Sequence, residues 1–538
     1  MRTPSDQAFE SAAALCAAEQ VHIPDVIQSH GALIAVDNRT FEIDFASANI
    51  PEFLGVGVSA LLSVTLQKVF APDTRHALMN GLLLNETGQL SNDLGVLEFA
   101  EREALVSSCP AKDHTIFEFE PVQETVPDRK SLQDLEFLTA QVRDASDRNV
   151  LFEKTVQLLQ SLTGYDRVMV YEFDDNGNGQ VVAEAVVPKC ESYLGLNFPS
   201  WDIPEQARVL MKRFPLRYIA NANASQVPVL AAGGISGPLD MTFAQLRGAS
   251  RVHMEYLRNM GTCASFTLSI LFEGRLWGMI SMHHRAPRYP SQRQRQICRS
   301  FAEFFALRLE GFQKQRQIGR LQRAAEIRRK LAAEPSVMSL GERNVKSELL
   351  RDFCEAAQSD GAALFQDGIL STYGLVPERK TIERLMHAKE LGGEITTLCK
   401  LSSDLPWLPE DKLNRIAGLL SLQLPEQGRF FLFREARDLK VTWAGDPKKQ
   451  LTLGSEQPRL HPRQSFTAYV QEVRGTCEPW TAEQKQIAEG SLLVFGTKKH
   501  TDLIRKTTRQ QSVLMAELHR RVSGISALIR SLSRPTCT

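Results

Sequence analysis

A long stretch without proline near the middle of the chain most constrains the fold. From residue 291 to about 358 the sequence is rich in charged residues and mostly helical in pattern, and no proline interrupts it before Pro335. Apolar side chains at Phe301, Phe305 and Leu309 precede turns that are dense in Arg, Lys and Gln. A helix of this length is not stable alone, so it packs along the next domain or a second subunit, unless it is only a solvated connector.

The composition sets limits on the class of protein. The 538 residues predict about three or four domains, and an apolar fraction of 43% is enough for real cores. Lys and Arg together number 63, as do Asp and Glu, so no overall charge favours a nucleic acid or a membrane as partner. The nine cysteines include no Cys-x-x-Cys pair, so we expect neither structural disulfides nor a metal site. No secretion signal or membrane-spanning run is present, which predicts a cytoplasmic protein.

Local patterns place strands and helices on both sides of the long stretch. Alternating apolar residues over 32–36 and 41–45 predict a hairpin that turns at residues 37–40. Residues 131–164 are helical in pattern, and residues 165–173 alternate as a strand with Met169 and Tyr171 on one face. Further strands are expected at 265–272 and 276–283, and a third α+β domain from about 345 to 500.

Asp202-Ile203-Pro204 is the most informative short motif. The residue before a proline is pushed out of the α region, which leaves the carbonyl and carboxylate of Asp202 free for a partner. The ordinary interpretation is a helix entry with Pro204 at the first helical position. Four other segments give the motif its context: Cys16 to Gly31, Leu246 to Gly261, Leu276 to His284, and the pair Trp443-Ala444-Gly445 with Pro462-Arg463-Gln464-Ser465-Phe466.

Together these segments resemble the bacteriophytochromes, red-light receptors that carry a linear tetrapyrrole. The resemblance runs in order along nearly the whole chain. It implies an α+β protein of three tandem domains joined by long helices: a PAS domain at 1–125, a GAF domain at 126–318 and a PHY domain at 319–505 with a tongue at about 438–480. It also implies a knotted PAS–GAF junction with Ile27 at its centre. The implied cofactor is biliverdin IXα.

The resemblance assigns roles to individual residues. Cys16 would attach the bilin through a thioether, because Val252 stands where plant-type and cyanobacterial phytochromes carry their cysteine. Arg217 and Arg247 would pair with the two propionates. Hydroxyls of Ser250, Ser265 and Thr267 would support them. The Asp202 carbonyl, within Asp202-Ile203-Pro204, and His253 would flank the pyrrole nitrogens. The D ring would lie among Met169, Tyr171, Phe198, Tyr256 and His283. Without a ligand, most of these residues would be ordinary core or surface residues.

The tongue residues are Trp443, Gly445, Pro462, Arg463, Ser465 and Phe466. By the resemblance, Arg463 pairs with Asp202 in one light state, and in the other the tongue refolds between hairpin and helix and offers Ser465 to the same carboxylate. Several positions depart from the family pattern: Trp201, Met211, Ala444 and Ser29. Trp201 adds bulk beside the tongue contact, and Met211 removes a hydroxyl donor. The resting state and the efficiency of switching are therefore left open.

The end of the chain predicts an output helix. Thr481 with Gln484 three residues later has the pattern of a capping box. Apolar residues from Leu514 to Leu532 form a helical stripe, which predicts a coiled-coil-like helix at 506–538 and a homodimer. This segment resembles the dimerisation helix of HWE-type sensor histidine kinases. The phosphoacceptor position falls on Arg520, which cannot accept a phosphoryl group usefully, and no nucleotide-binding domain follows. We therefore expect no enzyme activity.

The residues are compatible with three functions. The first is a photoreceptor that offers a helix to an unknown signalling protein partner. The second is a truncated, light-regulated sensor histidine kinase, for which transfer of phosphate from ATP to the chain would be diagnostic. The third is a sensor that holds a bilin without photochemistry or responds to redox state.

Overall fold

The chain forms two compact units. A computed structural model describes residues 19–86, 91–99, 102–122, 128–333, 343–366, 368–409, 413, 415–424, 428–447, 451–453, 458–460, 462–490 and 512. One unit comprises Met1–Gln313 with Thr442–Gln471, and the other Lys314–Val441 with Glu472–Thr538. Cys16 and all of the predicted output helix except residue 512 lie outside the described residues. The α+β class is confirmed, with sheets of seven, eight and five strands and a two-stranded ribbon among the described residues.

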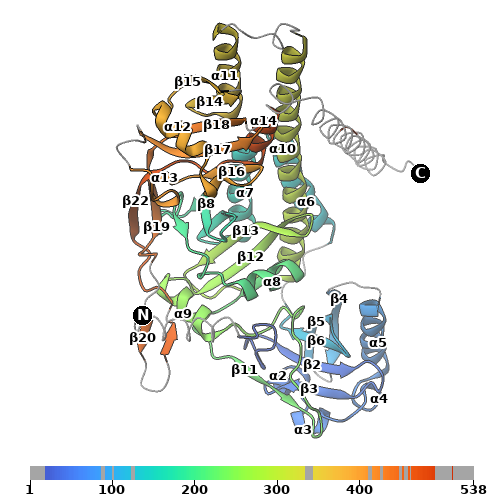
Figure 1. The fold of residues 1–538 in the computed structure, drawn as a ribbon. Coiled ribbons are helices and arrows are strands. Elements are labelled where there is room, and N and C mark those ends of the chain that lie inside the picture. The colour runs from blue at the N-terminus through green and yellow to red at the C-terminus, as the bar shows by residue number, and fades with distance from the viewer. Residues whose placement is uncertain are drawn as a thin grey trace, which may run out of the picture. The chain divides into compact units, whose positions relative to one another are not determined.

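The first sheet belongs to the predicted PAS domain (Figure 1). Its order is β1-β11-β3-β2-β6-β5-β4, and the predicted hairpin is confirmed as β2 and β3. Asp37 makes the turn, because its Oδ1 accepts from the backbone N–H groups of Arg39 and Thr40 at 2.8 Å each. The elements are β1 (Val26–Ile27), β2 (Ala32–Asp37), β3 (Ile43–Ser47), α2 (Ile50–Leu54), α3 (Val58–Leu61), α4 (Leu66–Val69), α5 (Pro72–Glu86), β4 (Asn92–Phe99), β5 (Arg102–Ala111), β6 (His114–Glu120) and β11 (Val227–Ala231).

The two faces of this sheet are covered by different parts of the chain. Ile34, Val36 and other alternate strand residues pack under α5. On the opposite face Leu33 and Ala35 pack against apolar residues of the segment 239–246, which lies more than a hundred residues later. The domain that follows therefore completes the PAS core on this side.

The second sheet has the order β10-β12-β13-β7-β8-β9-β19-β22. Residues 168 and 170 of β7 and 280 and 282 of β13 point into a core that α6, α7 and α10 close. The other face of the same strands is left for a site. The elements are α6 (Asp128–Arg143), α7 (Arg148–Thr163), β7 (Arg167–Phe173), β8 (Gly179–Val186), β9 (Asn197–Phe198), α8 (Glu205–Arg213), β10 (Leu216–Ile219), α9 (Arg251–Asn259), β12 (Ala264–Phe272), β13 (Arg275–His284), α10 (Gln292–Ala333), β19 (Arg437–Ala444) and β22 (Ala468–Thr476). A two-stranded ribbon lies between the last two, β20 (Leu451–Leu453) and β21 (Pro458–Leu460).

The prediction of one helical segment over 131–164 is corrected to two helices. The chain leaves the helix after Arg143 and re-enters it at Arg148. Asp147 has an extended backbone, and its carboxylate accepts from the N–H groups of Asn149 and Val150. An aspartate that caps a helix satisfies backbone donors which otherwise have no partner, so it favours a new helix start over a continuous helix.

The second unit contains the sheet of the predicted PHY domain, with the order β15-β14-β18-β17-β16. Apolar residues of α11 and α14 cover one face, and residues of α12, η2 and α13 cover the other. The capping box at Thr481 and Gln484 is confirmed. The elements are α11 (Arg343–Ala357), β14 (Gly361–Gln366), β15 (Ile369–Gly374), α12 (Arg379–Met386), η2 (Lys389–Leu391), β16 (Ile395–Leu398), α13 (Leu401–Asp404), β17 (Ile416–Gln423), β18 (Arg429–Glu435) and α14 (Ala482–Glu489).

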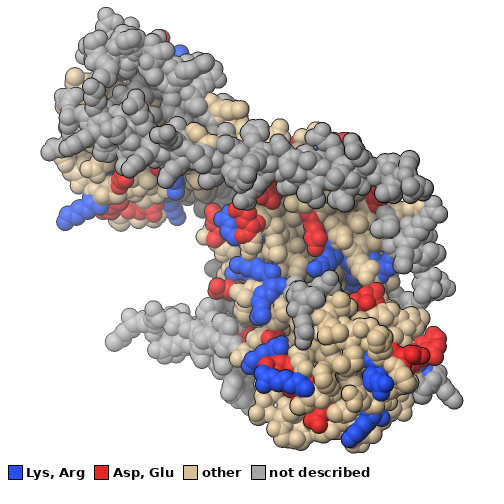
Figure 2. Space-filling model, turned by 90° about the vertical axis from the view of Figure 1, so that its right-hand side faces the viewer, with Lys and Arg blue, Asp and Glu red and all other residues tan. Residues whose placement is uncertain are grey.

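The long proline-free stretch forms two helices. Helix α10 has 42 residues, and α11 begins at Arg343 after a segment outside the described residues. The described helices include none that is long and apolar enough to cross a membrane. On the face drawn in Figure 2, the described basic and acidic side chains are interspersed rather than gathered into patches of one sign.

Candidate functional site

A cavity of about 470 Å³ opens on the free face of the second sheet. Its floor is made by alternate residues of neighbouring strands: Met169 and Tyr171 on β7, Ser265 and Thr267 on β12, and Met279, Ser281 and His283 on β13. Residues of α8 and α9 and the Asp202 segment form the walls. The size and the mostly apolar lining are typical of a site for a large organic ligand.

The Asp202 segment lies where this cavity meets the tongue. Pro204 is the N-cap of α8 with an extended backbone, and the helix begins at Glu205, so the expected first helical position is one residue too early. Asp202 pairs with Arg463, whose Nη2 lies 3.3 Å from Oδ2 and 3.4 Å from Oδ1. The Tyr256 hydroxyl donates to Oδ2 at 3.3 Å. Both side chains of the pair are nearly inaccessible, at 5% and 8% exposed for Asp202 and Arg463 respectively.

The tongue backbone holds Arg463 in place. Its guanidinium donates to the carbonyl oxygens of Ala444 and Gly445. Gly445 has a φ of +81°, and a Cβ there would clash with the carbonyl oxygen of Ser465, so both backbone conformation and space require glycine. Trp443 pairs in parallel with Asn197 of β9. Phe466 is buried and contacts the Tyr256 ring edge-on at 5.2 Å between centroids. The described parts of the tongue are strands and turns rather than helices.

Two arginines face the cavity, Arg247 buried and Arg217 half-buried, and neither forms an ion pair with a carboxylate of the described residues. Arg217 donates to the carbonyl oxygens of Gly248 at 3.0 Å and Gln245 at 3.5 Å. Arg247 donates to those of Met241 at 2.9 Å and Thr242 at 2.7 Å. Burial lowers the pKa of Arg217 to about 10, and burial together with the charge of Arg217 lowers that of Arg247. No carboxylate in the described ranges forms an ion pair with either one, so a ligand with two carboxylates would compensate both charges.

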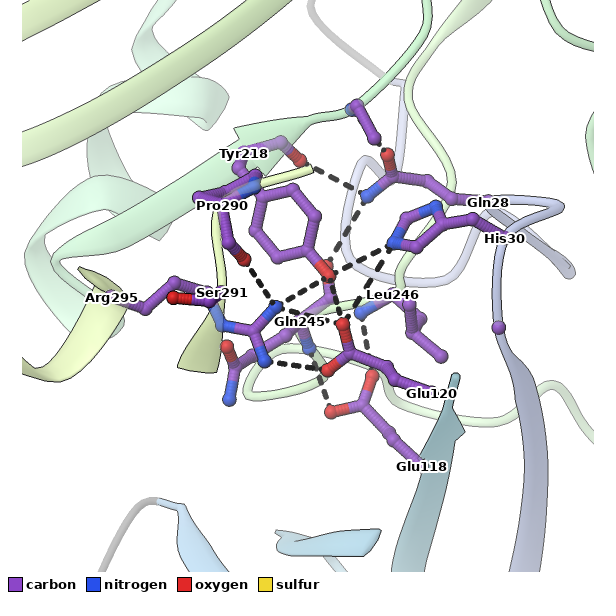
Figure 3. Close-up of polar contacts among 12 residues, drawn as sticks. Gln28, His30, Glu118, Glu120, Tyr218, Gln245, Leu246, Pro290, Ser291 and Arg295 are labelled. Atoms are coloured by element: carbon purple, nitrogen blue, oxygen red, sulfur yellow. Dashed lines mark hydrogen bonds and ion pairs between the residues drawn. The ribbon is translucent and has the colours of Figure 1, made fainter. Parts of the chain in front are cut away.

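The loop that carries Arg247 is held from the PAS side, as Figure 3 shows. The Glu118 carboxylate of β6 accepts from the N–H groups of Gln245 at 3.1 Å and Leu246 at 2.6 Å. Burial raises the pKa of Glu118 to about 7. On the other side of the loop, the Gln28 N–H donates to the Leu246 carbonyl at 2.8 Å, and residue 27 forms a bridge with Arg247. The leader and the PAS sheet thus position this arginine, while the predicted knot around Ile27 stays a prediction.

Next to Glu118 lies an ion pair that joins β6 to α10 (Figure 3). Arg295 donates Nη2 to Oε1 of Glu120 at 2.6 Å and Nη1 to Oε2 at 2.8 Å. Tyr218 of β10 donates its hydroxyl to the same carboxylate at 3.2 Å, and His30 contacts that hydroxyl at 3.1 Å. Burial would raise the pKa of Glu120, but the charge and hydrogen bonds of Arg295 outweigh it and lower the pKa. Both charges are therefore compensated inside the protein.

The two cavity histidines are neutral near pH 7. The protein atoms around His253 and the nearby charge of Arg217 lower its pKa to about 4, although the residue is exposed on the cavity side. Burial, with Arg167 and His253, lowers that of His283 to about 3. The Nε2 of His283 lies 3.1 Å from the Ser281 hydroxyl, and its buried Nδ1 has no partner among the described residues. An unpaired buried ring nitrogen is costly, and a polar atom of a ligand would satisfy it.

The low pKa of His283 predicts a pH dependence of stability. The unfolded chain binds a proton at this histidine below about pH 6.5, whereas the folded protein does so only near pH 3. Between these values the unfolded state binds more protons, so stability falls as pH falls, by up to about 1.4 kcal/mol per pH unit for one group. In ligand-free protein, His283→Gln should flatten the slope of unfolding free energy between pH 7 and 5, measured by urea denaturation, with exposed His76→Gln as control. Equal slopes in His283→Gln and wild type would contradict it.

The structure gathers most predicted site residues around one cavity. Asp202, Ile203, Pro204, Phe198, Ser250, Tyr256, Pro462, Arg463 and Ser465 line it together with the floor residues, both arginines and His253. Trp443, Gly445 and Phe466 are not among the lining residues. Cys16 is outside the described residues, but Glu19 and Val21 of the same leader line the cavity. The departures Trp201 and Met211 also line it. Ser281 and Met279 were missed, although they alternate with His283 on one strand.

Comparison with known proteins matches the whole architecture. Three family models match in order: a PAS fold at residues 16–122, a GAF domain at 147–309 and a phytochrome region at 329–493. A bacteriophytochrome from Pseudomonas aeruginosa is 31% identical over 96% of this chain and 71% of its own length. This chain belongs to the bacteriophytochromes.

Other relatives agree with this assignment. A bacteriophytochrome from Xanthomonas campestris pv. campestris is 27% identical over 96% of this chain and 83% of its own length. The crystal structure of a bacteriophytochrome from the photosynthetic bacterium R. palustris superposes with a TM-score of 0.78, at 27% identity, over 89% of this chain and 98% of that one. The bacteriophytochrome is therefore a PAS-GAF-PHY photosensory module. No kinase domain is among the matched families.

Proposed function

We propose that this bacteriophytochrome is a red/far-red photoreceptor that binds biliverdin IXα in the 470 Å³ cavity, attached through Cys16. The observation that carries the proposal is the pair of guanidinium groups, half-buried Arg217 and buried Arg247, facing a mostly apolar slot without an ion pair to any described carboxylate. A linear tetrapyrrole has a long apolar body and two propionates. Those two features match the slot and the two cations.

Each part of the cavity has a role toward this ligand. The bilin, when bound, supplies the photochemistry, a Z to E isomerisation at the C15 bridge that turns its D ring. Arg217, Arg247 and the hydroxyls of Ser250, Ser265 and Thr267 hold the propionates. The Asp202 carbonyl and His253 contact the pyrrole nitrogens. His283 offers its unpaired Nδ1 to the D ring, and the aromatic side chains around it exclude water.

The signal leaves the cavity through the Asp202–Arg463 pair. The pair is nearly inaccessible to solvent, and Arg463 is tied to the tongue backbone at Ala444 and Gly445. A change at the D ring that weakens this pair leaves a buried guanidinium without its charge partner, which disfavours the strand form of the tongue. The tongue then refolds and Ser465 meets Asp202. The result is a two-state element biased by a local electrostatic change.

The output passes to another protein. We propose that the predicted helix at 506–538 forms a homodimer and presents its surface to an unidentified signalling partner. Its resemblance to an HWE-type dimerisation helix with arginine at the phosphoacceptor position supports a non-enzymatic role. Incubation with radioactive ATP tests this part, because a labelled chain would show a kinase.

Absorbance spectra test the photoreceptor proposal directly. The protein is mixed with biliverdin and measured in darkness, after red light and after far-red light. Reversible exchange between red and far-red bands is expected, and the dark band identifies the resting state. A stable bilin band without exchange would instead support a sensor without photochemistry. Trp201 and Met211, which depart from the family pattern, would then be the first residues to replace by those of the pattern. Absence of a bilin band would refute the proposal.

Asp202→Ala should keep covalent biliverdin but impair photoconversion. The variant removes the carboxylate that pairs with Arg463 and accepts from Tyr256, while the cavity floor and both arginines remain. We expect at least about a tenfold loss of conversion rate or extent, the effect of losing one charge-assisted contact worth about 1.4 kcal/mol or more. Flash illumination with absorbance detection measures it. Glu205→Ala, an exposed carboxylate at the start of α8, is the matched control. An intact red/far-red cycle in Asp202→Ala would refute the role.

A further inference from the structure

Two cysteines of the second unit, far apart in sequence, lie side by side. Cys399 follows β16, and Cys477 follows β22, the returning strand of the tongue. The Cys477 N–H donates to the Cys399 carbonyl at 2.9 Å, and the Thr476 hydroxyl donates to the same oxygen at 3.0 Å. A direct backbone N–H to carbonyl hydrogen bond brings the Cα atoms of its two residues to roughly 5–6 Å, inside the range that a disulfide spans. The Cys477 thiol donates to the Glu478 carbonyl at 3.2 Å, and Cys399 is near enough to add to the effect of burial in raising the pKa of Cys477.

The two thiols differ in accessibility. Both are reduced in the structure. Cys477 is 2% exposed, and its Sγ packs on Gly418, where a Cβ would clash with it. Burial and the neighbouring Cys399 raise the pKa of Cys477 to about 12, so it keeps its proton. Cys399 is half-buried and reachable from solvent. Cys399 is therefore the thiol that an oxidant meets first.

A buried cation lies beside the pair. The Arg434 guanidinium donates to the carbonyl oxygens of Glu478 at 2.8 Å and Pro479 at 3.2 Å, directly after Cys477. Its plane also lies over the Trp480 ring, with 4.0 Å from Cζ to the centroid. A nearby cation stabilises the negative charge that passes to the leaving hydroxide when sulfur attacks a peroxide.

We propose that Cys399 and Cys477 form a peroxide-sensitive dithiol whose oxidation cross-links the root of the tongue to the PHY sheet. The Cys399 thiolate attacks one oxygen of hydrogen peroxide, the O–O bond breaks, and hydroxide leaves to take up the thiol proton as water. The Cys399 sulfenic acid then condenses with the Cys477 thiol: the S–S bond forms, the S–O bond breaks, and the thiol proton leaves with the hydroxyl group as a second water. Two thiols are oxidised and one peroxide is reduced.

Peptide mapping of the full-length protein tests the chemistry without any need for bilin or light. After treatment with hydrogen peroxide, free thiols are blocked with N-ethylmaleimide and the chain is digested with trypsin under non-reducing conditions. Cleavage after Lys389 and Lys400 releases residues 390–400, and cleavage after Arg474 and Lys485 releases residues 475–485; each peptide holds one cysteine. In the treated protein we expect a disulfide to join these two peptides and dithiothreitol to separate them. In the untreated protein we expect two separate peptides, each with its cysteine blocked by N-ethylmaleimide.

Matched variants separate this site from the other thiols. Cys399→Ser and Cys477→Ser should each abolish the joined peptide, whereas Cys190→Ser, in a loop of the first unit, should leave it unchanged. If Cys477→Ser does not fold, the map of the wild-type protein decides alone. Two results would overturn the proposal. One is oxidation of Cys399 to sulfinic acid without a cross-link. The other is that both peptides still react with N-ethylmaleimide after peroxide has oxidised Cys190.

The consequence for signalling rests on the proposed function and is measured separately. A cross-link at residue 477 holds the end of β22 against the sheet, so a tongue that must refold should do so more slowly. Light conversion of oxidised protein should be several-fold slower than that of reduced protein, and Cys477→Ser should show no such difference. A cross-link with unchanged conversion would overturn the coupling to the tongue, while failure of the proposed function appears as absence of photoconversion in the reduced protein.

Discussion

Arg295→Ala should destabilise the first unit by about 3–5 kcal/mol, the usual cost of leaving a buried charge without its partner. The Arg295 and Glu120 side chains are 3% and 8% exposed, and two short hydrogen bonds join them. In the variant the Glu120 carboxylate keeps the Tyr218 hydroxyl as a donor but loses its only ion-pair partner among Lys and Arg in the described ranges. Urea denaturation followed by tryptophan fluorescence and circular dichroism measures the loss.

Two further variants keep this prediction testable. Arg299→Ala lies one turn later on α10 and breaks only an exposed pair with Glu303, so it should cost no more than about 0.5 kcal/mol. Replacing Arg295 and Glu120 together by methionine removes both charges and should recover most of the stability. A loss no larger in Arg295→Ala than in Arg299→Ala would mean that water reaches Glu120 and compensates its charge.

The pH dependence of this effect has a definite sign. The pKa of Glu120 is lower in the folded protein than its ordinary value near 4.3. The pair therefore contributes its full stability above that value and loses it as pH falls through the folded pKa. Without Arg295, burial raises the pKa of Glu120, so the difference between wild type and Arg295→Ala should be largest near pH 7 and should shrink as pH falls through that raised pKa, already above pH 4.

The strands of the site could be predicted because their pattern is local. Alternation over 165–173 placed Met169 and Tyr171 on one face, and the structure has both on the cavity floor. The same rule applied to β13 would have found Ser281 and Met279. The break between α6 and α7 could also have been predicted, because Asp147 is a strong N-cap residue. It was missed because the helical periodicity continues on both sides of it.

The long-range contacts that hold the site in place could not be predicted from the sequence. Glu120 and Arg295 are 175 residues apart, and Glu118 meets Leu246 across 128 residues. A charged residue in a strand or helix is usually exposed, so composition gives no reason to bury these groups, and only the packing of PAS strand, GAF loop and long helix brings them together. The contact between Cys399 and Cys477 arises in the same way, because the two cysteines are 78 positions apart and most of the tongue lies between them.

Cys16→Ser should abolish covalent attachment of biliverdin while leaving reversible binding. Cys16 lies three residues before Glu19, which lines the cavity, and three residues of extended chain span roughly 10 Å. The leader is tied down close by, where the Met241 N–H donates to the His22 carbonyl at 2.9 Å. The sulfur of Cys16 can therefore reach a ligand in the cavity.

The other cysteine near α9 does not offer an alternative. Cys263 is 5% exposed, its sulfur contacts Asn221 and Asn223, and it is absent from the cavity lining. Val252 aligns with the attaching cysteine of plant-type and cyanobacterial phytochromes and has no thiol. After acid-urea denaturation, wild-type protein and a Cys190→Ser control should retain the bilin by mass spectrometry, and Cys16→Ser should release all of it. Retention in Cys16→Ser would mean that a different thiol attacks the bilin, and that the leader serves only to close the cavity.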